Sequence, residues 1–115
     1  MKICIATTGP DLNSNVSPVF GRAPYFLIIN SETDEFKVIK NEAESAIRGA
    51  GIAAAQTLST EKVKVLIVGN VGPNAQFALE KAGIKVILGV SGTAKEALEN
   101  FKKDKISQEH EKDSN

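Results

Sequence analysis

The sequence is poor in the side chains that most often bind metals or act as nucleophile and base: it has one cysteine and one histidine in 115 residues. A single cysteine excludes an internal disulfide and any site with several cysteine ligands, and it fits a reducing cytoplasm. Cys4 lies in a short apolar run, which favours a small buried side chain over a nucleophile. His110 lies in a polar segment near the end of the chain, so no serine or cysteine of the folded part can have a histidine base.

The sequence also has no excess of either charge, because its 14 basic and 14 acidic side chains balance. It therefore lacks the broad positive field with which proteins hold nucleic acids or anionic membranes. No segment approaches the roughly 20 apolar residues that span a bilayer, and the first residues lack the features of a signal peptide. We expect a soluble cytoplasmic protein with neither nucleic acid nor membrane as partner.

The clearest unit that is present is the stretch 63–83, which predicts a buried strand, a glycine-rich turn and a helix. Residues 63–68 are mostly apolar and β-branched, as in a strand covered on both faces. Pro73 suits the first turn of a helix, where its missing N–H costs nothing, and Gly83 suits a left-handed cap at the helix end.

The other patterns complete the order strand, strand, strand, helix, strand, helix, strand, helix. Further strands are expected at 3–6, 25–29, 36–39 and 84–88, and further helices from 47 and from Thr93, which forms a capping box with Glu96. Right-handed crossovers join the last strands in parallel, and the opening hairpin supplies one antiparallel strand. The simplest sheet has the first strand at the centre, the hairpin of the second and third strands on one side, and the last two strands on the other. The fold class is thus α/β, with a five-stranded mixed sheet in one domain over residues 1–103. Residues 104–115 are almost all charged or polar and predict a flexible tail.

In this arrangement the first, fourth and fifth strands end at one edge of the sheet, where the turns 7–9, 69–72 and 89–92 meet. Ligands of open α/β sheets bind outside the carboxyl ends of the strands, and helix N-termini there offer unpaired N–H groups and partial positive charge. The edge therefore predicts an anionic ligand. The alternative is that the glycines only form tight turns, and neither turn matches a phosphate-binding loop or the GxGxxG motif.

Arg22 is the basic residue best placed to serve such a site, because it precedes the second strand among small and apolar residues. Its guanidinium could bind an anion through two nitrogens, or it could anchor a loop by donating to backbone carbonyls; the two interpretations have equal weight. Arg48 is better explained as a solvated surface residue. The candidate binding residues are Arg22, Asn70, Gly72, Asn74, Ser91 and Gly92.

Acid–base catalysis finds little support, because most acidic residues fall in turns or on exposed helix faces. Asp11, Glu42 and Glu44 are the acids near the predicted edge, and they do not form an evident pair. The sequence therefore predicts a protein without catalytic residues.

The motifs SPVFGRAPYFLI, GAGIAAAQTL, VLIVGNVGPNA and AGIKVILGVSGTAKEAL, with the spacing between them, resemble the dinitrogenase iron-molybdenum cofactor biosynthesis family. The resemblance covers nearly all of residues 1–106. It implies a ribonuclease H-like three-layer fold with helices on both faces of the sheet. It also implies an iron-sulfur or iron-molybdenum cluster as cofactor and a cluster-assembly or nitrogenase-related protein as partner.

Two departures from the family pattern bear on that function. Cofactor-handling relatives often carry a histidine before the Phe-Gly pair, where this sequence has Val19, and several end in histidine-rich tails, where this sequence has only His110. The acids with which nucleases of this fold hold two metals are also missing from the first strand, the first helix and the turn after the fourth strand.

We therefore predict a non-catalytic binding or carrier protein that holds an anionic cluster or a small ligand at the carboxyl edge of the sheet. A regulatory or protein-interaction module without metal is the first alternative, favoured by Val19. A small enzyme acting on a phosphorylated metabolite is the second, favoured by the helix N-termini at one edge.

Overall fold

The computed structural model describes residues 1–113, with side chains as far as Asp104. Within this part the chain forms five strands and three helices in the predicted order. They are β1 (Lys2–Thr7), β2 (Tyr25–Asn30), β3 (Phe36–Lys40), α1 (Ala50–Thr60), β4 (Val63–Ile67), α2 (Pro73–Lys81), β5 (Lys85–Ile87) and α3 (Ala94–Asp113). None of these helices has the length and apolar content needed to cross a bilayer.

The strands form one mixed sheet in the order β3-β2-β1-β4-β5, which confirms the predicted topology. Strand β1 lies at the centre, antiparallel to β2 and parallel to β4, and β5 continues the parallel half. The β2–β3 hairpin is antiparallel, so β1, β3, β4 and β5 all end at the same edge of the sheet.

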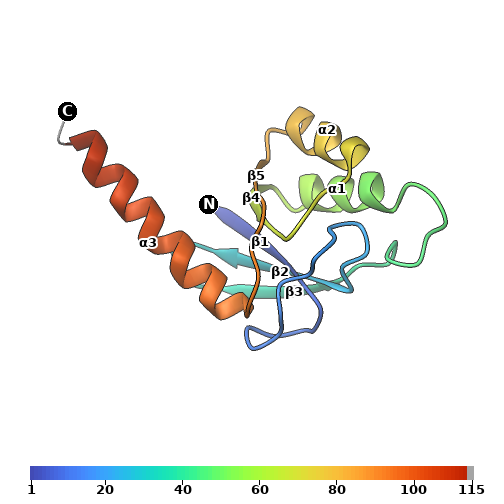
Figure 1. Cartoon of the computed structure of the whole chain (residues 1–115), viewed down its shortest axis with the longest axis horizontal. Helices are drawn as coiled ribbons and strands as arrows, with labels where there is room; N and C mark the ends of the chain where they lie inside the picture. The colour runs from blue at the N-terminus through green and yellow to red at the C-terminus, as the bar shows by residue number, and fades with distance from the viewer. Residues whose placement is uncertain (114–115) are drawn as a thin grey trace.

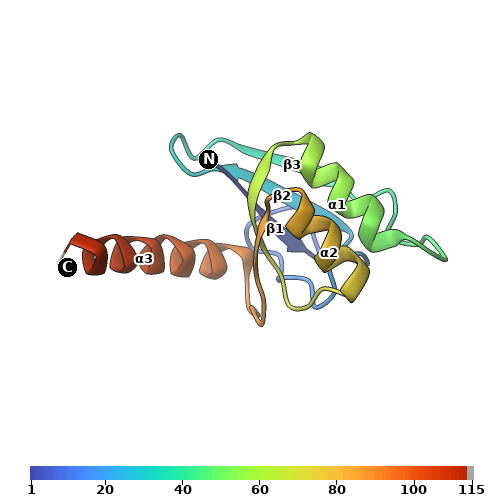
Figure 2. The same ribbon diagram turned by 90° about the horizontal axis from the view of Figure 1, so that it is seen from above.

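The side chains of β1 alternate between two cores, because successive residues of a strand point to opposite faces. Cys4 and Ala6 belong to the core beneath α1 and α2, whereas Ile3 and Ile5 belong to the core beneath α3. Figure 1 and Figure 2 show α1 and α2 together on one side of the sheet, while α3 runs away from the body on the other. The molecule thus has the three layers that the sequence predicts, with helices on both faces.

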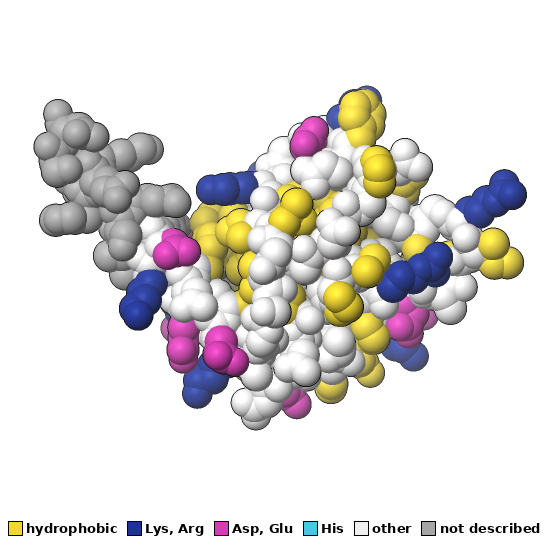
Figure 3. Space-filling view, in the orientation of Figure 1, with side chains coloured by type: hydrophobic (Ala, Val, Ile, Leu, Met, Phe, Trp, Pro, Cys, Tyr) yellow, Lys and Arg dark blue, Asp and Glu magenta, His cyan; other side chains and the backbone are white. Residues whose placement is uncertain are grey.

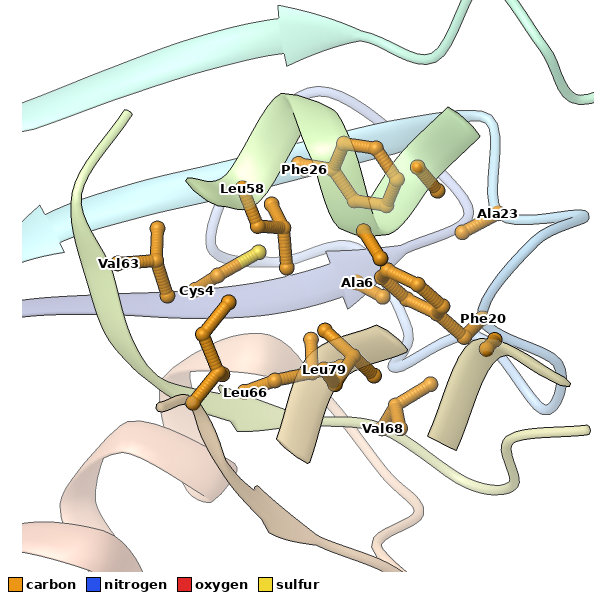
Figure 4. Close-up of a cluster of buried hydrophobic side chains, with 14 of the residues drawn as sticks. Cys4, Ala6, Phe20, Ala23, Phe26, Leu58, Val63, Leu66, Val68 and Leu79 are labelled. Carbon is orange, nitrogen blue, oxygen red and sulfur yellow. The ribbon is translucent and has the colours of Figure 1, made fainter. Parts of the chain in front are cut away.

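The core beneath α1 and α2 contains the rings of Phe20 and Phe26, whose centroids lie 5.5 Å apart. Leu58 of α1 and Leu79 of α2 are fully buried in the same core, which is shown in Figure 4. Each such leucine stabilises the fold by about 1.5–3 kcal/mol relative to an exposed position. Cys4 is also fully buried there, which confirms the expectation of a small buried side chain, and burial raises the pKa of its thiol.

The helix ends follow the signals in the sequence with one difference. Pro73 occupies the first turn of α2 and Gly83 has a φ of 76° just after it, as expected. Helix α1 begins at Ala50, three residues after the predicted start, because Gly49 adopts a left-handed conformation with a φ of 74°. Ile47 is consequently 94% exposed rather than packed on the sheet.

Helix α3 continues to Asp113, past the domain boundary that the composition places at residue 103. Among the described side chains of α3, the last core residue is Phe101, and the ion pair between Lys102 and Asp34 follows it. The assignment of residues 104–115 to a flexible tail stays a prediction, and its last two residues lie outside the described part of the chain.

Candidate functional site

The loop 8–24 crosses the carboxyl edge of the sheet and pairs with both neighbouring turns. Its backbone bridges Asn70 through Val19 and bridges Thr93 through Asn15. The Phe20 N–H donates to the Asn70 carbonyl at 3.0 Å, and the Val16 N–H donates to the Gly92 carbonyl at 2.8 Å. The loop therefore separates the predicted edge into two regions, one beside α1 and α2 and one beside α3.

The first region contains a cavity of about 320 Å³ at the adjoining N-termini of α1 and α2. The loop 19–22 forms its remaining wall. The cavity is lined by Val19, Gly21, Arg22, Gly49, Ala50, Gly51, Ile52, Gly72, Pro73, Asn74 and Ala75. Three of the six predicted binding residues, Arg22, Gly72 and Asn74, thus share one cavity.

Both helix N-termini at this cavity lack a capping side chain. The N-cap residues are Gly49 and Gly72, and neither helix has an acidic residue in its first turn. The first intrahelical bonds are donated by Ala53 and Gln76, so the N–H groups of the residues before them have no partner within the helix. Each end also carries the positive pole of a helix dipole, and the cavity thus faces two such poles.

Small residues allow these two helix ends and the loop to approach one another. A Cβ atom on Gly21 would lie 2.8 Å from the backbone nitrogen of Gly51, and one on Gly51 would lie 2.7 Å from the Cβ of Ala75. Contacts this short do not occur between real Cβ atoms and their neighbours, so both positions require glycine at the present spacing. Gly21 of GRA and Gly51 of GAG therefore have a packing role that their sequence pattern alone does not reveal.

Arg22 fulfils one of the two roles considered for it. Its Nη1 donates to the backbone carbonyls of Glu44 at 2.9 Å and of Ala46 at 2.6 Å, which confirms the loop-anchor interpretation. These bonds use one of the three guanidinium nitrogens, and the side chain still lines the cavity. Binding of an anion by Arg22 stays a prediction. Arg48, interpreted as a solvated residue, is exposed.

Asn41 is a site residue that the sequence analysis missed. It is 3% exposed, and its Nδ2 donates to the carbonyls of Gly21 at 3.1 Å and Ala23 at 2.8 Å, on either side of Arg22. Its Oδ1 accepts from the Ala43 N–H at 3.1 Å. Asn41 thereby links the loop 8–24, which contains Arg22, to the segment 44–46, whose carbonyls accept hydrogen bonds from Arg22. The only sequence signal was an asparagine directly after the third strand, which by itself predicts a turn.

The other predicted residues lie elsewhere. Asn70 is exposed in the turn before α2, where its carbonyl is bonded to Phe20. Ser91 lines a second cavity, beside α3, and the carbonyl of Gly92 is bonded to Val16. The structure therefore does not bring these three residues to the cavity that contains Arg22.

The N-terminus of α3 differs from those of α1 and α2 because it already faces a carboxylate. Glu96 Oε1 accepts from the Thr93 N–H at 3.2 Å and from Thr93 Oγ1 at 2.9 Å, and these hydrogen bonds lower the pKa of Glu96. The predicted capping box is confirmed by the reciprocal bond from the Glu96 N–H to Thr93 Oγ1. An external anion at this end would meet a negative charge.

Protein ligands for a metal ion are not gathered at the cavity. Among the described residues, no group of three or more His, Cys, Asp and Glu side chains is placed to hold one. Val19 lines the cavity and is 45% exposed, and Ile52, which also lines it, is 41% exposed. The cavity thus combines apolar side chains, backbone N–H groups and one guanidinium, so a metal cluster bound there would have to bring its own ligands.

The fold and this cavity define a small three-layer α/β protein with a concave, N–H-rich site at the carboxyl edge of its sheet. The chain belongs to the dinitrogenase iron-molybdenum cofactor family, whose model matches residues 1–104.

Individual relatives agree with this assignment. An uncharacterized protein of Methanocaldococcus jannaschii is 31% identical over 109 residues, covering 92% of this chain and 89% of its own. The apo form of the orange protein from Desulfovibrio gigas is 37% identical with a TM-score of 0.86, covering 90% of this chain and 88% of its own. A Thermotoga protein described as a candidate NifB is 38% identical with a TM-score of 0.79, covering 89% and 87%.

Proposed function

We propose that this protein is a non-catalytic carrier that holds a preassembled anionic cluster, of iron-sulfur or iron-molybdenum type, in the cavity between the N-termini of α1 and α2. The observation that carries the proposal is the convergence of two uncapped helix N-termini and Arg22 on one cavity. Family membership and a relative whose solved structure is the apo form support it. Such a carrier would exchange its cargo with a cluster-assembly or nitrogenase-related protein.

The charge of the cavity favours an anion. Each helix N-terminus contributes the equivalent of about half a positive charge, and Arg22 adds a full one, so the lining presents about two positive charges. The residues that line the cavity include no acid to oppose them. Helix N-termini with this arrangement are common binding sites for anions, because backbone N–H groups supply directed hydrogen bonds as well as charge.

The lining also suits a cluster better than a bare metal ion. A cluster whose metals are saturated by sulfide or by its own small ligands needs hydrogen bonds and contact surface from the protein, not coordinating side chains. Backbone N–H groups of Gly51 and Asn74 would donate to its outer atoms, and Val19 and Ile52 would contact its polarisable surface. The volume of about 320 Å³ lies at the lower end of the range for small-molecule sites.

The same lining argues against catalysis at this cavity. Arg22 is its one ionisable side chain, and it offers no serine, cysteine, histidine or carboxylate to act as nucleophile, acid or base. Arginine stays protonated in proteins and cannot take up a proton at neutral pH. Binding and release are therefore the activities that this set of residues supports.

The experiment is anaerobic incubation with an iron-sulfur or iron-molybdenum cluster donor, followed by desalting and measurement of the absorbance that stays with the protein. Wild type is expected to retain the cluster, and Arg22→Ala to bind it about tenfold or more weakly, because a charge-assisted hydrogen bond is lost. Lys95→Ala, which removes a cation from the exposed surface of α3, is the matched control. Retention of no absorbance by wild type, or equal retention by Arg22→Ala, would refute the proposal.

A thermal melt with phosphate-containing compounds distinguishes the cluster carrier from the alternative, a small enzyme that acts on a phosphorylated metabolite. A ligand that binds only the folded state raises the melting temperature. A rise with such compounds but not with the cluster would favour the alternative.

A further inference from the structure

A second and larger cavity, of about 790 Å³, lies on the opposite face of the sheet. It is a groove between α3 and the strands β4 and β5, and the sheet separates it from the N-termini of α1 and α2. Its lining residues are Met1, Lys64, Val65, Ile67, Lys85, Ile87, Gly89, Val90, Ser91, Ala97, Asn100, Phe101 and Asp104. Figure 3 shows apolar side chains exposed in the hollow between α3 and the body, with basic side chains beside them.

The groove exists because one helix covers this face of a five-stranded sheet. Helix α3 packs on β1 at the centre and leaves the β4–β5 side open. Val65 and Ile67 form the closed floor, while Ile87, Val90 and Phe101 are only half-buried. The opposite face carries two helices, α1 and α2, so the α3 face has room for a second one. We propose that this groove binds an amphipathic helix of a partner protein, with apolar residues on one side and acidic residues flanking them.

Basic side chains at the rim of the groove favour a partner helix with acidic residues. Lys64 and Lys85 are exposed on the sheet side of the groove, and neither takes part in an ion pair among the described side chains. Asp104, on α3, is the one acid in the lining. Both lysines lie at the strand ends opposite the first cavity, since Lys64 is the second residue of β4 and Lys85 is the first residue of β5. Carboxylates on a docked helix would pair with them there, which gives orientation and partner choice.

The geometry of α3 fits a helix lying alongside it. Ala97, Asn100, Phe101 and Asp104 line the groove at spacings of three and four, which is one stripe of a helix over about two turns, or roughly 10 Å. A partner helix would present its own residues at i, i+3 or i+4, and i+7 into this space.

A second copy of the chain is a poorer occupant. The large apolar residues of α3 whose side chains are described already pack on its own sheet. Among the described side chains of the helices, Phe77 of α2 is the most exposed large hydrophobic, at 63%, and Lys81 lies over its ring at 5.4 Å from the centroid. Docking of α2 would therefore bring a cation toward Lys64 and Lys85.

The test uses the full chain and two fluorescently labelled synthetic peptides of about 18 residues, long enough to form an isolated helix. Both carry leucines at helical spacing; one is flanked by glutamates and the other by lysines at the same positions. Fluorescence anisotropy is expected to show the glutamate peptide binding about tenfold more tightly than the lysine peptide. The double variant Lys64→Glu with Lys85→Glu is expected to reverse this order. These lysines are exposed, so the fold should tolerate the change.

The matched control is Lys40→Glu with Lys95→Glu, which makes the same change in net charge at exposed positions outside the groove. It should keep the preference for the glutamate peptide. Equal binding of the two peptides, or reversal by the control pair, would overturn the proposal. So would a dimer in sedimentation that the Lys64 and Lys85 changes dissociate, since it would assign the groove to a second copy. Binding of decanoate without binding of either peptide would assign it to a small amphiphile instead and overturn the proposal equally.

Discussion

A single buried amide determines how the cavity wall is assembled. Asn41 bonds to the two carbonyls that flank Arg22, and Arg22 in turn bonds to two carbonyls of the segment 44–46 that follows Asn41. Asn41 therefore holds the backbone on either side of Arg22, and Arg22 holds the segment that follows Asn41. The carbonyls that accept from Asn41 are buried and costly when unpaired, whereas those that accept from Arg22 are exposed, so Asn41 contributes more to the stability of this pair of loops.

Replacement of this amide by its isosteric acid is expected to destabilise the protein in a pH-dependent way. In Asn41→Asp an ionised carboxylate would face the carbonyl oxygens of Gly21 and Ala23, at a cost of about 1–3 kcal/mol. The protonated acid can still donate one hydrogen bond, so the pKa of the introduced group is raised and its destabilising effect grows as the pH rises. Urea unfolding at pH 4.5 and pH 7.5, with wild type in parallel, measures the difference; a penalty that is the same at both pH values would contradict this account.

The two regions of the sheet edge differ in how the helices that begin there are capped. Helices α1 and α2 begin without a cap or an acid, whereas α3 begins with the Thr93–Glu96 capping box. The sequence alone distinguished them in part, because the capping box is a local pattern of four residues. The convergence of α1 and α2 was not predictable in this way, since it depends on the fit of Gly21 and Gly51 between segments far apart in the chain.

The capping carboxylate should make the stability of the protein depend on acidity. The hydrogen bonds from Thr93 lower the pKa of Glu96 in the folded state, so the ionised form stabilises the fold. This contribution is complete above the ordinary glutamate range and disappears as the pH falls through the lowered pKa. Glu96→Gln should thus be less stable than wild type at pH 7, by a margin that narrows below about pH 4. Chemical unfolding across this range tests it, with Glu99→Gln as a control for charge removal from the same helix; a margin independent of pH would speak against it.

The contact between the loop and the two helix ends should not tolerate one added methyl group. A Cβ on Gly21 would meet backbone atoms of Gly51 and Ala50 at 2.8–3.2 Å, so Gly21→Ala is expected to cost about 1–3 kcal/mol and to weaken ligand binding by displacing α1. Gly72→Ala is the matched control, because no atom lies within 4 Å of its Cβ and its φ is −68°. It should change the unfolding free energy by less than about 0.5 kcal/mol. Equal effects of the two changes would show that the cavity wall is not closely packed.

For the whole molecule, the order of strands and helices was predictable from hydrophobic periodicity and crossover handedness, whereas the three layers with helices on both faces followed from the family resemblance. The shape of the edge was not, because the loop 8–24 carries no periodic pattern. Its pairing with Asn70 and Thr93 divides the turns that the sequence analysis combined into one site. The start of α1 was also placed too early, since the helical spacing that begins at Ile47 does not show that Gly49 adopts a left-handed conformation before the helix.

The extent of the domain can be tested by shortening the chain. A variant ending at Asp104 keeps all described core residues of α3 and the Lys102–Asp34 ion pair, so it should unfold within about 0.5 kcal/mol of the full chain. A variant ending at Glu99 loses Phe101 as well and should be destabilised by about 3 kcal/mol or more. Calorimetry or urea unfolding compares the three; a large loss with the first variant would place residues after 104 within the domain.

The burial of Cys4 in the central strand also gives the protein an internal reporter of its own opening. Because this thiol is the only one in the chain and has no exposed surface, a thiol reagent can reach it only when the core between the sheet and α1 and α2 opens. The rate of labelling under native conditions thus reports openings of this core rather than fluctuations of the surface loops. Any ligand that tightens the fold as a whole will slow that reaction, whichever cavity it occupies.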